Sequence, residues 1–181
     1  MQSTIQEPLS GAPSGQSTEM EKLAGKYLTF TLKGQSYGID VLRVREIIRV
    51  TQITSVPQMP DYVRGVLNLR GRIIPVLDLR LRFGLAEAQD TDTTCIVVAQ
   101  VRGSEGKNIQ MGLVVDGVEE VLNITARDIE PTPDFGHEAA TEYLRGIAKT
   151  KAGVKALLDI DELLALDANE SRLPSVAPAA H

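Results

Sequence analysis

Aromatic residues, histidine and cysteine are scarce in this chain. Its 181 residues include four Tyr, three Phe, two His, one Cys and no Trp. Apolar residues make up 43% of the composition, so a core can form, but it must consist mainly of Val, Ile and Leu. Because β-branched residues favour strands over helices, the composition indicates a mainly β protein.

These scarcities also exclude several kinds of site. A single cysteine, Cys95, excludes an intrachain disulfide, and we expect it to be a small buried residue in a reducing compartment. His137 has no second ligand at metal-binding spacing, so we expect it to be exposed, and we predict no metal site and no cofactor. The chain has no apolar run of about 18 residues and no signal-peptide pattern. We therefore expect a cytoplasmic protein without direct membrane insertion.

Charge is distributed unevenly along the chain. Residues 26–83 carry ten Lys or Arg against four Asp or Glu, residues 84–181 carry eight against seventeen, and the first 25 residues have a net charge of −2. A basic half and an acidic half suggest protein partners that bind in a fixed orientation. Nucleic acid is not the predicted partner, because the pI is about 5.1 and no aromatic residues are interleaved with the arginines.

The chain is organised around residues 60–84. Two apolar runs, 66–69 and 73–77, are joined by Arg-Gly-Arg at 70–72, which predicts a hairpin. Pro75 cannot donate a hydrogen bond, so the second strand should lie at an edge or break there. Asp78 should cap a short helix over 79–83. The arginines that fringe this stretch are Arg64, Arg70, Arg72, Arg80 and Arg82. No catalytic pair of side chains accompanies them, so the hairpin is typical of a surface that binds another protein.

The remaining segments alternate between strand patterns and short helical patterns. Residues 1–25 and 167–181 are polar or rich in Ala and Pro, and we expect both to be disordered tails. Apolar residues at 41, 44, 47 and 48 have helical spacing and predict a turn or two of helix with one apolar side. The predicted strands cover 26–32, 35–40, 50–56, 94–102, 108–115, 143–148 and 154–158, a long loop covers 127–142, and Asp159 begins a helix that ends at 166.

Two parts of the chain repeat the same pattern. The matched positions are Gly38 and Gly112, Glu46 and Glu120, Gly65 and Gly146, and Asp78 and Asp159. We infer two copies of a β-rich unit, about 26–84 and 94–166, with tight turns and five short strands each, which suits small closed barrels around a shared apolar core. A terminal strand could be exchanged between the halves. The arginines of the first hairpin have no counterpart in the second, so we assign shared positions to the fold and look for function in the differences.

These motifs resemble the CheW-like domain family from about residue 26 to 166. The resemblance rests on Tyr37-Gly38-Ile39-Asp40, Val44-Arg45-Glu46-Ile47, Arg64-Gly65-Val66-Leu67-Asn68-Leu69-Arg70-Gly71, Ile74-Pro75-Val76-Leu77-Asp78-Leu79, Val115-Asp116-Gly117-Val118 and Tyr143-Leu144-Arg145-Gly146. The family includes the CheW adaptor of bacterial chemotaxis arrays and the C-terminal regulatory domain of the histidine kinase CheA. Because these 181 residues contain no phosphotransfer, ATP-binding or receiver segment, we expect the stand-alone adaptor.

The resemblance implies two SH3-like five-stranded β-barrels packed around a shared apolar core, with short helices and no catalysis. It implies an adaptor, recruited to membrane-associated arrays, that couples the cytoplasmic hairpin tip of chemoreceptors (methyl-accepting chemotaxis proteins) to the regulatory domain of CheA. Contacts with other copies in array rings are left open. By position, the receptor-binding residues are Val41, Val44, Glu46, Ile47 and Phe135. The kinase-binding or hairpin-ordering residues are Arg64, Gly65, Asn68, Arg70 and Arg72.

Each assignment has a structural alternative. Val41 and Ile47 could be ordinary core between the barrels, and Glu46, which is matched by Glu120, could support the fold. The glycines at 65 and 71 could serve backbone geometry, and Asp78 and Asp159 fit helix caps better than a catalytic pair. The alternative functions are a small-molecule-binding or enzymatic small β-barrel and, less strongly, an RNA-binding SH3-like barrel.

Overall fold

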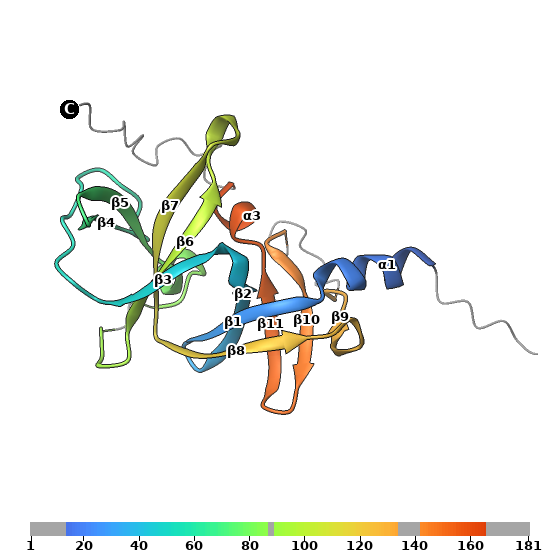
Figure 1. Ribbon diagram of the computed structural model, residues 1–181. Helices are drawn as coiled ribbons and strands as arrows, with labels where there is room; N and C mark the ends of the chain where they lie inside the picture. The colour runs from blue at the N-terminus through green and yellow to red at the C-terminus, as the bar shows by residue number, and fades with distance from the viewer. Residues whose placement is uncertain (1–13, 87–88, 134–141, 166–181) are drawn as a thin grey trace, which may run out of the picture.

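The computed structural model describes residues 14–86, 89–133 and 142–165. Most of this part is strand, and the helices are short (Figure 1). The strands are β1 (Gly25–Leu32), β2 (Gln35–Asp40), β3 (Val44–Arg49), β4 (Val63–Leu69), β5 (Arg72–Asp78), β6 (Cys95–Arg102), β7 (Asn108–Val115), β8 (Gly117–Ile124), β9 (Ile129–Glu130), β10 (Leu144–Thr150) and β11 (Gly153–Leu158). The α-helices are α1 (Ser14–Leu23), α2 (Leu79–Arg82) and α3 (Ile160–Ala165), and the 3-10 helices are η1 (Val41–Arg43), η2 (Ser104–Gly106) and η3 (Ala126–Asp128).

The strands of the described residues form two sheets, which we call barrel 1 and barrel 2. Barrel 1 has the strand order β3-β6-β7-β5-β4, and barrel 2 has the order β8-β1-β2-β11-β10-β9. Barrel 1 is continuous in sequence, whereas barrel 2 combines the first two strands of the chain with its last four. The two sequence repeats are therefore not the two barrels: β1 and β2 belong to the first repeat but pair with strands of the second.

Each barrel contains one parallel strand pair, and a repeated glycine lies at each. β2 runs parallel to β11 with Gly38 opposite Leu157, and β7 runs parallel to β5 with Gly112 opposite Val76. A Cβ atom on Gly38 would lie 3.2 Å from Leu157 across its parallel pair. One on Gly112 would lie 3.4 Å from Val76 across its pair and only 2.7 Å from Ile96 of β6. Close packing at both positions therefore explains why both repeats carry glycine here.

The largest core cluster lies between the barrels. Alternate residues of β1, namely Leu28, Phe30 and Leu32, face this shared core, while Tyr27 belongs to the core of barrel 2. Leu163 of α3 is completely buried in the shared core. Barrel 1 encloses a separate, wholly aliphatic cluster around Val76.

The helix predicted from the spacing of residues 41–48 is wrong. Only Val41–Arg43 is helical, as a 3-10 turn, and β3 then pairs antiparallel with β6. The register shifts between Val44 and Glu46, which is a β-bulge. Because the bulge adds one residue to the strand, apolar residues three apart can share a face, which imitates the helical period.

The strand predicted over residues 50–56 is also wrong. Within that segment only Thr54 pairs, through a single bridge to Val66, whose two N–O distances are 2.8 and 2.9 Å. The alternating sequence pattern is local, but a strand needs a neighbour along its length, and in this segment only Thr54 has one. The prediction for Pro75 concerned the strand β5. The pairing of β5 with β7 begins only at Val76, so Pro75 has a strand partner in β4 and none in β7.

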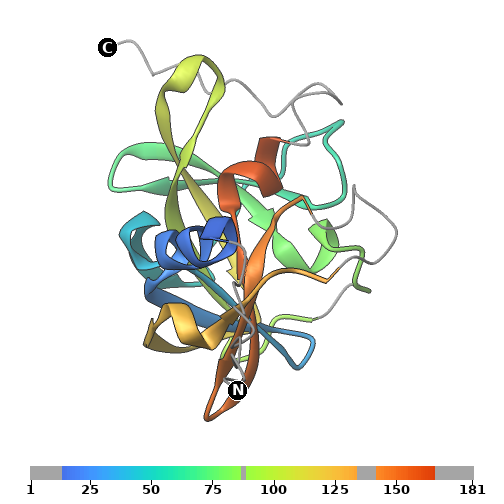
Figure 2. The same ribbon diagram turned by 90° about the vertical axis from the view of Figure 1, so that its right-hand side faces the viewer.

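The N-terminal segment was predicted to be disordered, but Ser14–Leu23 forms α1. Met20 and Leu23 pack against the core of barrel 2, and the Tyr27 hydroxyl donates a hydrogen bond of 2.5 Å to the Leu23 carbonyl. Figure 2 shows α1 on the side of barrel 2 that carries η3. These tertiary contacts stabilise a helix whose own sequence has little apolar periodicity. Residues 1–13 and the predicted tail 167–181 lie outside the described residues.

Candidate partner-binding surface

The β4–β5 hairpin turns at Arg70 and Gly71, as predicted. Their φ angles are 52° and 84°, and Leu69 lies opposite Arg72, so the turn is of the two-residue type with two left-handed positions. The Asn68 side chain orders this turn, because its Oδ1 atom accepts a hydrogen bond of 2.8 Å from the Gly71 amide. Arg70 and Arg72 are exposed at the end of the hairpin.

Arg70 is paired with Glu46 of β3, the strand at the other end of the strand order of barrel 1. The two guanidinium nitrogens donate to the two carboxylate oxygens at 2.8 and 2.9 Å, which is a bidentate pair. The Arg70 side chain is 76% exposed, so the pair contributes at most about 1 kcal/mol to stability. The pair holds the two side chains next to each other. Glu46 is predicted to bind the receptor, and Arg70 is predicted to bind the kinase.

Because of the bulge in β3, the predicted receptor-binding residues Val44, Glu46 and Ile47 lie on two faces of the strand. Val44 and Ile47 lie opposite Ala99 and Val97, which belong to the shared core between the barrels. Glu46 instead lies opposite Val98, which belongs to the core of barrel 1. Directly paired residues share a face, so Val44 and Ile47 lie together on the inter-barrel side, and Ile47 is 45% exposed at its margin.

The η1 turn places two further aliphatic residues near this margin. Asp40 caps the turn by accepting a hydrogen bond of 2.9 Å from the Leu42 amide. Val41 is half-buried, whereas Leu42 is 77% exposed, the highest value among the large apolar residues that the structure describes. Sequence reasoning named Val41 and missed Leu42. Phe135, the remaining predicted contact, lies outside the described residues.

Arg64 and Gly65 are held within the protein. Arg64 makes a bidentate pair with Asp90 at 3.0 and 2.9 Å, and its side chain is 29% exposed. Gly65 has a φ of 138°, and a Cβ atom there would lie 2.0 Å from the Thr54 carbonyl oxygen. Gly65 therefore allows the Thr54–Val66 bridge to form, which favours its structural alternative.

Arg80 is the centre of a charge network that the sequence did not predict. Its side chain is 1% exposed and donates hydrogen bonds of 2.8–3.0 Å to Asp78, Asp90 and Asp116. Hydrogen bonding to Asp78, opposed by burial and assisted by the other two carboxylates, raises the pKa of Arg80 above its usual value. Asp78 ends β5, Asp90 lies in the segment between the repeats, and Asp116 connects β7 to β8. The network therefore joins barrel 1, barrel 2 and the segment between them.

Both predicted helix caps are present. The Asp78 carboxylate accepts a hydrogen bond of 3.0 Å from the Arg80 amide at the start of α2. The Asp159 carboxylate accepts hydrogen bonds from the Asp161 and Glu162 amides at 3.0 and 3.1 Å, at the start of α3.

The ionisable side chains of the described residues do not gather into a metal site. Among the residues that the structure describes, no three His, Cys, Asp or Glu side chains come close enough to hold a metal ion. Cys95 is half-buried rather than fully buried, and burial raises the pKa of its thiol. None of the helices in the described part is long and apolar enough to cross a membrane.

The sequence profile of the CheW-like domain matches residues 26–168. The chain belongs to the CheW-like domain family. This confirms the predicted family, and the matched region includes β3, the β4–β5 hairpin and the Arg80 network.

Individual CheW-like proteins show the same similarity. Chemotaxis protein CheW of Klebsiella aerogenes is 40% identical over 150 residues, which cover 80% of this chain and 87% of that protein. Chemotaxis protein CheW of Bacillus subtilis is 30% identical over 156 residues, covering 86% of this chain and 97% of that protein. The crystal structure of scaffolding protein TtCheW from Thermoanaerobacter tengcongensis superposes with a TM-score of 0.68 at 34% identity, covering 77% of this chain and 92% of that chain. The predicted fold class, two SH3-like barrels around a shared core, is confirmed, with β9 as an additional short strand in barrel 2.

The CheW-like domain match begins at Lys26, so α1 precedes it. The sequence offered little signal for α1, because Met20 and Leu23, which pack on barrel 2, are too few to show a helical period in an otherwise polar segment. The sequence carried a local signal only for the Asp78 cap, because the other two aspartates of the Arg80 network come from segments 10 and 36 residues away in the chain.

Proposed function

We propose that this CheW-like protein is a non-catalytic cytoplasmic adaptor that couples chemoreceptors to the histidine kinase CheA in membrane-associated chemotaxis arrays. Its relatives support this proposal, because they are chemotaxis proteins and a scaffolding protein that align over most of their length. The observation that carries the proposal is the position of β3, which presents Val44 and Ile47 at the inter-barrel margin on one face. On its other face Glu46 pairs with Arg70 of the β4–β5 hairpin.

The receptor side is the inter-barrel margin of β3 and η1. Val44 and Ile47 face the seam between the barrels, and Val41 precedes them on η1. An amphipathic helix binds to such a surface by placing its apolar stripe against aliphatic side chains. The cytoplasmic tip of a chemoreceptor, which is a helical hairpin, supplies that helix. Glu46 and Phe135 remain predicted members of this surface.

The kinase side is the β4–β5 hairpin. Arg70 and Arg72 are exposed and fit direct contact with the regulatory domain of CheA. Arg64, Gly65 and Asn68 fit the ordering role, because each is engaged in holding the hairpin or the adjoining segment. An arginine at the centre of an interface can contribute strongly to affinity, which favours Arg70 as the main kinase contact.

The proposal is tested by titrating the full chain with a receptor cytoplasmic hairpin and, separately, with the CheA regulatory domain. Binding to both is expected, and binding to neither contradicts it. In an isotope-labelled sample, receptor-induced chemical-shift changes should concentrate at β3 and η1, and kinase-induced changes at the β4–β5 hairpin. A small-molecule or enzymatic function would instead show shifts converging on a pocket when metabolites are added, without binding to either protein.

A further inference from the structure

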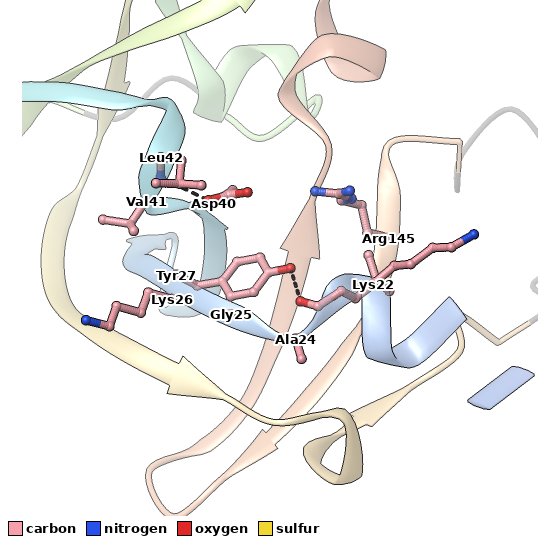
Figure 3. A pocket seen from close by; sticks show the side chains of 10 residues that line it. Lys22, Ala24, Gly25, Lys26, Tyr27, Asp40, Val41, Leu42 and Arg145 are labelled. Atoms are coloured by element: carbon pink, nitrogen blue, oxygen red, sulfur yellow. Dashed lines mark hydrogen bonds between the residues drawn. The ribbon is translucent and has the colours of Figure 1, made fainter. Parts of the chain in front are cut away.

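A pocket of about 270 Å³ lies where the C-terminal end of α1 meets the start of β1, the η1 turn and β10 (Figure 3). Its lining includes Val41 and Leu42, so it adjoins the proposed receptor surface. The pocket therefore extends that surface toward the N-terminal helix.

The charged residues of this pocket are mainly cationic. Lys22, Lys26 and Arg145 contribute three positive charges against the single carboxylate of Asp40, which leaves a net charge of +2. Figure 3 shows the two lysine side chains extending to either side of the pocket, with the Arg145 guanidinium directed toward Asp40. The pocket thus combines aliphatic side chains with flanking cations.

Existing contacts of these cations are weak. Lys22 pairs with Glu19 at 2.9 Å, but both side chains are about two-thirds exposed, and such surface pairs are easily exchanged for a partner's carboxylate. Arg145 lies 3.9 Å from Asp159 and is 35% exposed. A docking segment can therefore use these charges without breaking a buried ion pair.

We propose that this pocket is an accessory docking site for an acidic, amphipathic helix of the receptor hairpin. This inference rests on the proposed function and adds to it a preference for partner charge. The apolar stripe of the helix packs on Val41 and Leu42, and carboxylates that flank the stripe bind Lys22 and Lys26. Charge complementarity supports this occupant, because carboxylates on the helix can replace the exposed contacts that Lys22 and Arg145 make with the protein's own carboxylates.

The N-terminal helix thereby becomes part of the recognition surface. Lys22 belongs to α1, which precedes the region matched by the family profile, whereas Lys26 and Arg145 lie within it. A CheW-like domain without α1 would lack one wall of the pocket. We infer that α1 makes this adaptor selective for receptors whose tips carry acidic residues beside the apolar stripe.

The test measures the affinity of the full chain for a purified receptor cytoplasmic hairpin by fluorescence anisotropy. The double reversal K22E+K26E is compared with K107E+K151E, which changes the net charge by the same amount at exposed turns remote from the pocket. We expect the pocket variant to bind about tenfold more weakly and the control to bind like the wild type. Raising NaCl from 50 to 300 mM should weaken the wild type more than the pocket variant, because salt screens exposed charges.

The outcomes separate the two proposals. If the wild type binds the hairpin and the pocket variant binds equally well, the docking site is wrong while the adaptor function stands. If the wild type does not bind the hairpin, the adaptor function fails and the docking site fails with it. The neutral variant K22Q+K26Q, expected to bind about threefold more weakly, decides the matter if the reversal perturbs folding.

Discussion

Replacing Arg80 with methionine is expected to lower the free energy of unfolding by about 3–5 kcal/mol. Methionine keeps an unbranched apolar stem but removes the guanidinium that bonds to three aspartates at 2.8–3.0 Å. Asp78 stays buried at 5% exposure and keeps the longer contact with Arg64, at 3.9 Å. Asp90 and Asp116, at 30% and 28% exposure, can instead recover water. The poorly compensated charge at Asp78 is therefore the main source of the loss.

The assay is thermal and urea unfolding followed by far-UV circular dichroism. For a chain of this size, each kcal/mol corresponds to roughly 2–4 °C, so we expect the melting temperature to fall by roughly 6–20 °C. Arg72→Met is the matched control, because Arg72 is exposed, and its effect should stay within about 0.5 kcal/mol. A loss below about 1 kcal/mol for Arg80→Met would refute the view that this network joins the two barrels.

The same network predicts how stability depends on pH. Hydrogen bonds from Arg64, partly opposed by burial and assisted by Arg80, hold the pKa of Asp90 below its usual value. A carboxyl group with a lowered folded-state pKa contributes stability that is fully present above its unfolded pKa, about 3.9, and is lost as the pH falls through the folded value. The wild type should therefore lose stability below about pH 4, with a shallower loss in Arg80→Met. An equal slope in both proteins would contradict the role of Arg80 in this titration.

Four further substitutions test the proposed surfaces and the fold. Arg70→Ala should weaken binding to the CheA regulatory domain about tenfold by calorimetry while lowering the melting temperature by no more than about 4 °C, and a large thermal loss would make Arg70 structural. Ile47→Asp should abolish detectable binding to the receptor hairpin in an unchanged fold, and unaltered affinity would show that the receptor surface is misplaced. Gly65→Ala should cost about 2 kcal/mol or more in urea unfolding because of the Thr54 carbonyl, whereas Gly71→Ala, with no atom within 4 Å of its Cβ, should cost about 1 kcal/mol; equal losses would contradict the close approach.

Local patterns predicted two of the hairpins well. The turn at Arg70-Gly71 and the hairpin formed by β6 and β7 depend on residues close in sequence, and both formed as predicted. Hairpins set by neighbours in the chain were therefore accessible from the sequence. The matched glycines Gly38 and Gly112 were visible as a repeat, but their role at parallel strand pairs, which join distant segments, became clear only from the structure.

Features that depend on contacts between distant segments could not be predicted from the sequence. The bulge between Val44 and Glu46 gave a strand the spacing of a helix, because the extra residue depends on pairing with β6. The Arg80 network unites three aspartates from separate segments, and only the backbone cap by Asp78 was predictable locally.

The most direct test of the central claim is a ternary binding measurement. The full chain, saturated with the receptor hairpin, is titrated with the CheA regulatory domain and analysed by sedimentation velocity. The account predicts a complex containing all three components, because the inter-barrel margin and the β4–β5 hairpin are separate surfaces. Displacement of the receptor hairpin by the kinase domain, or failure of either to bind, would contradict it.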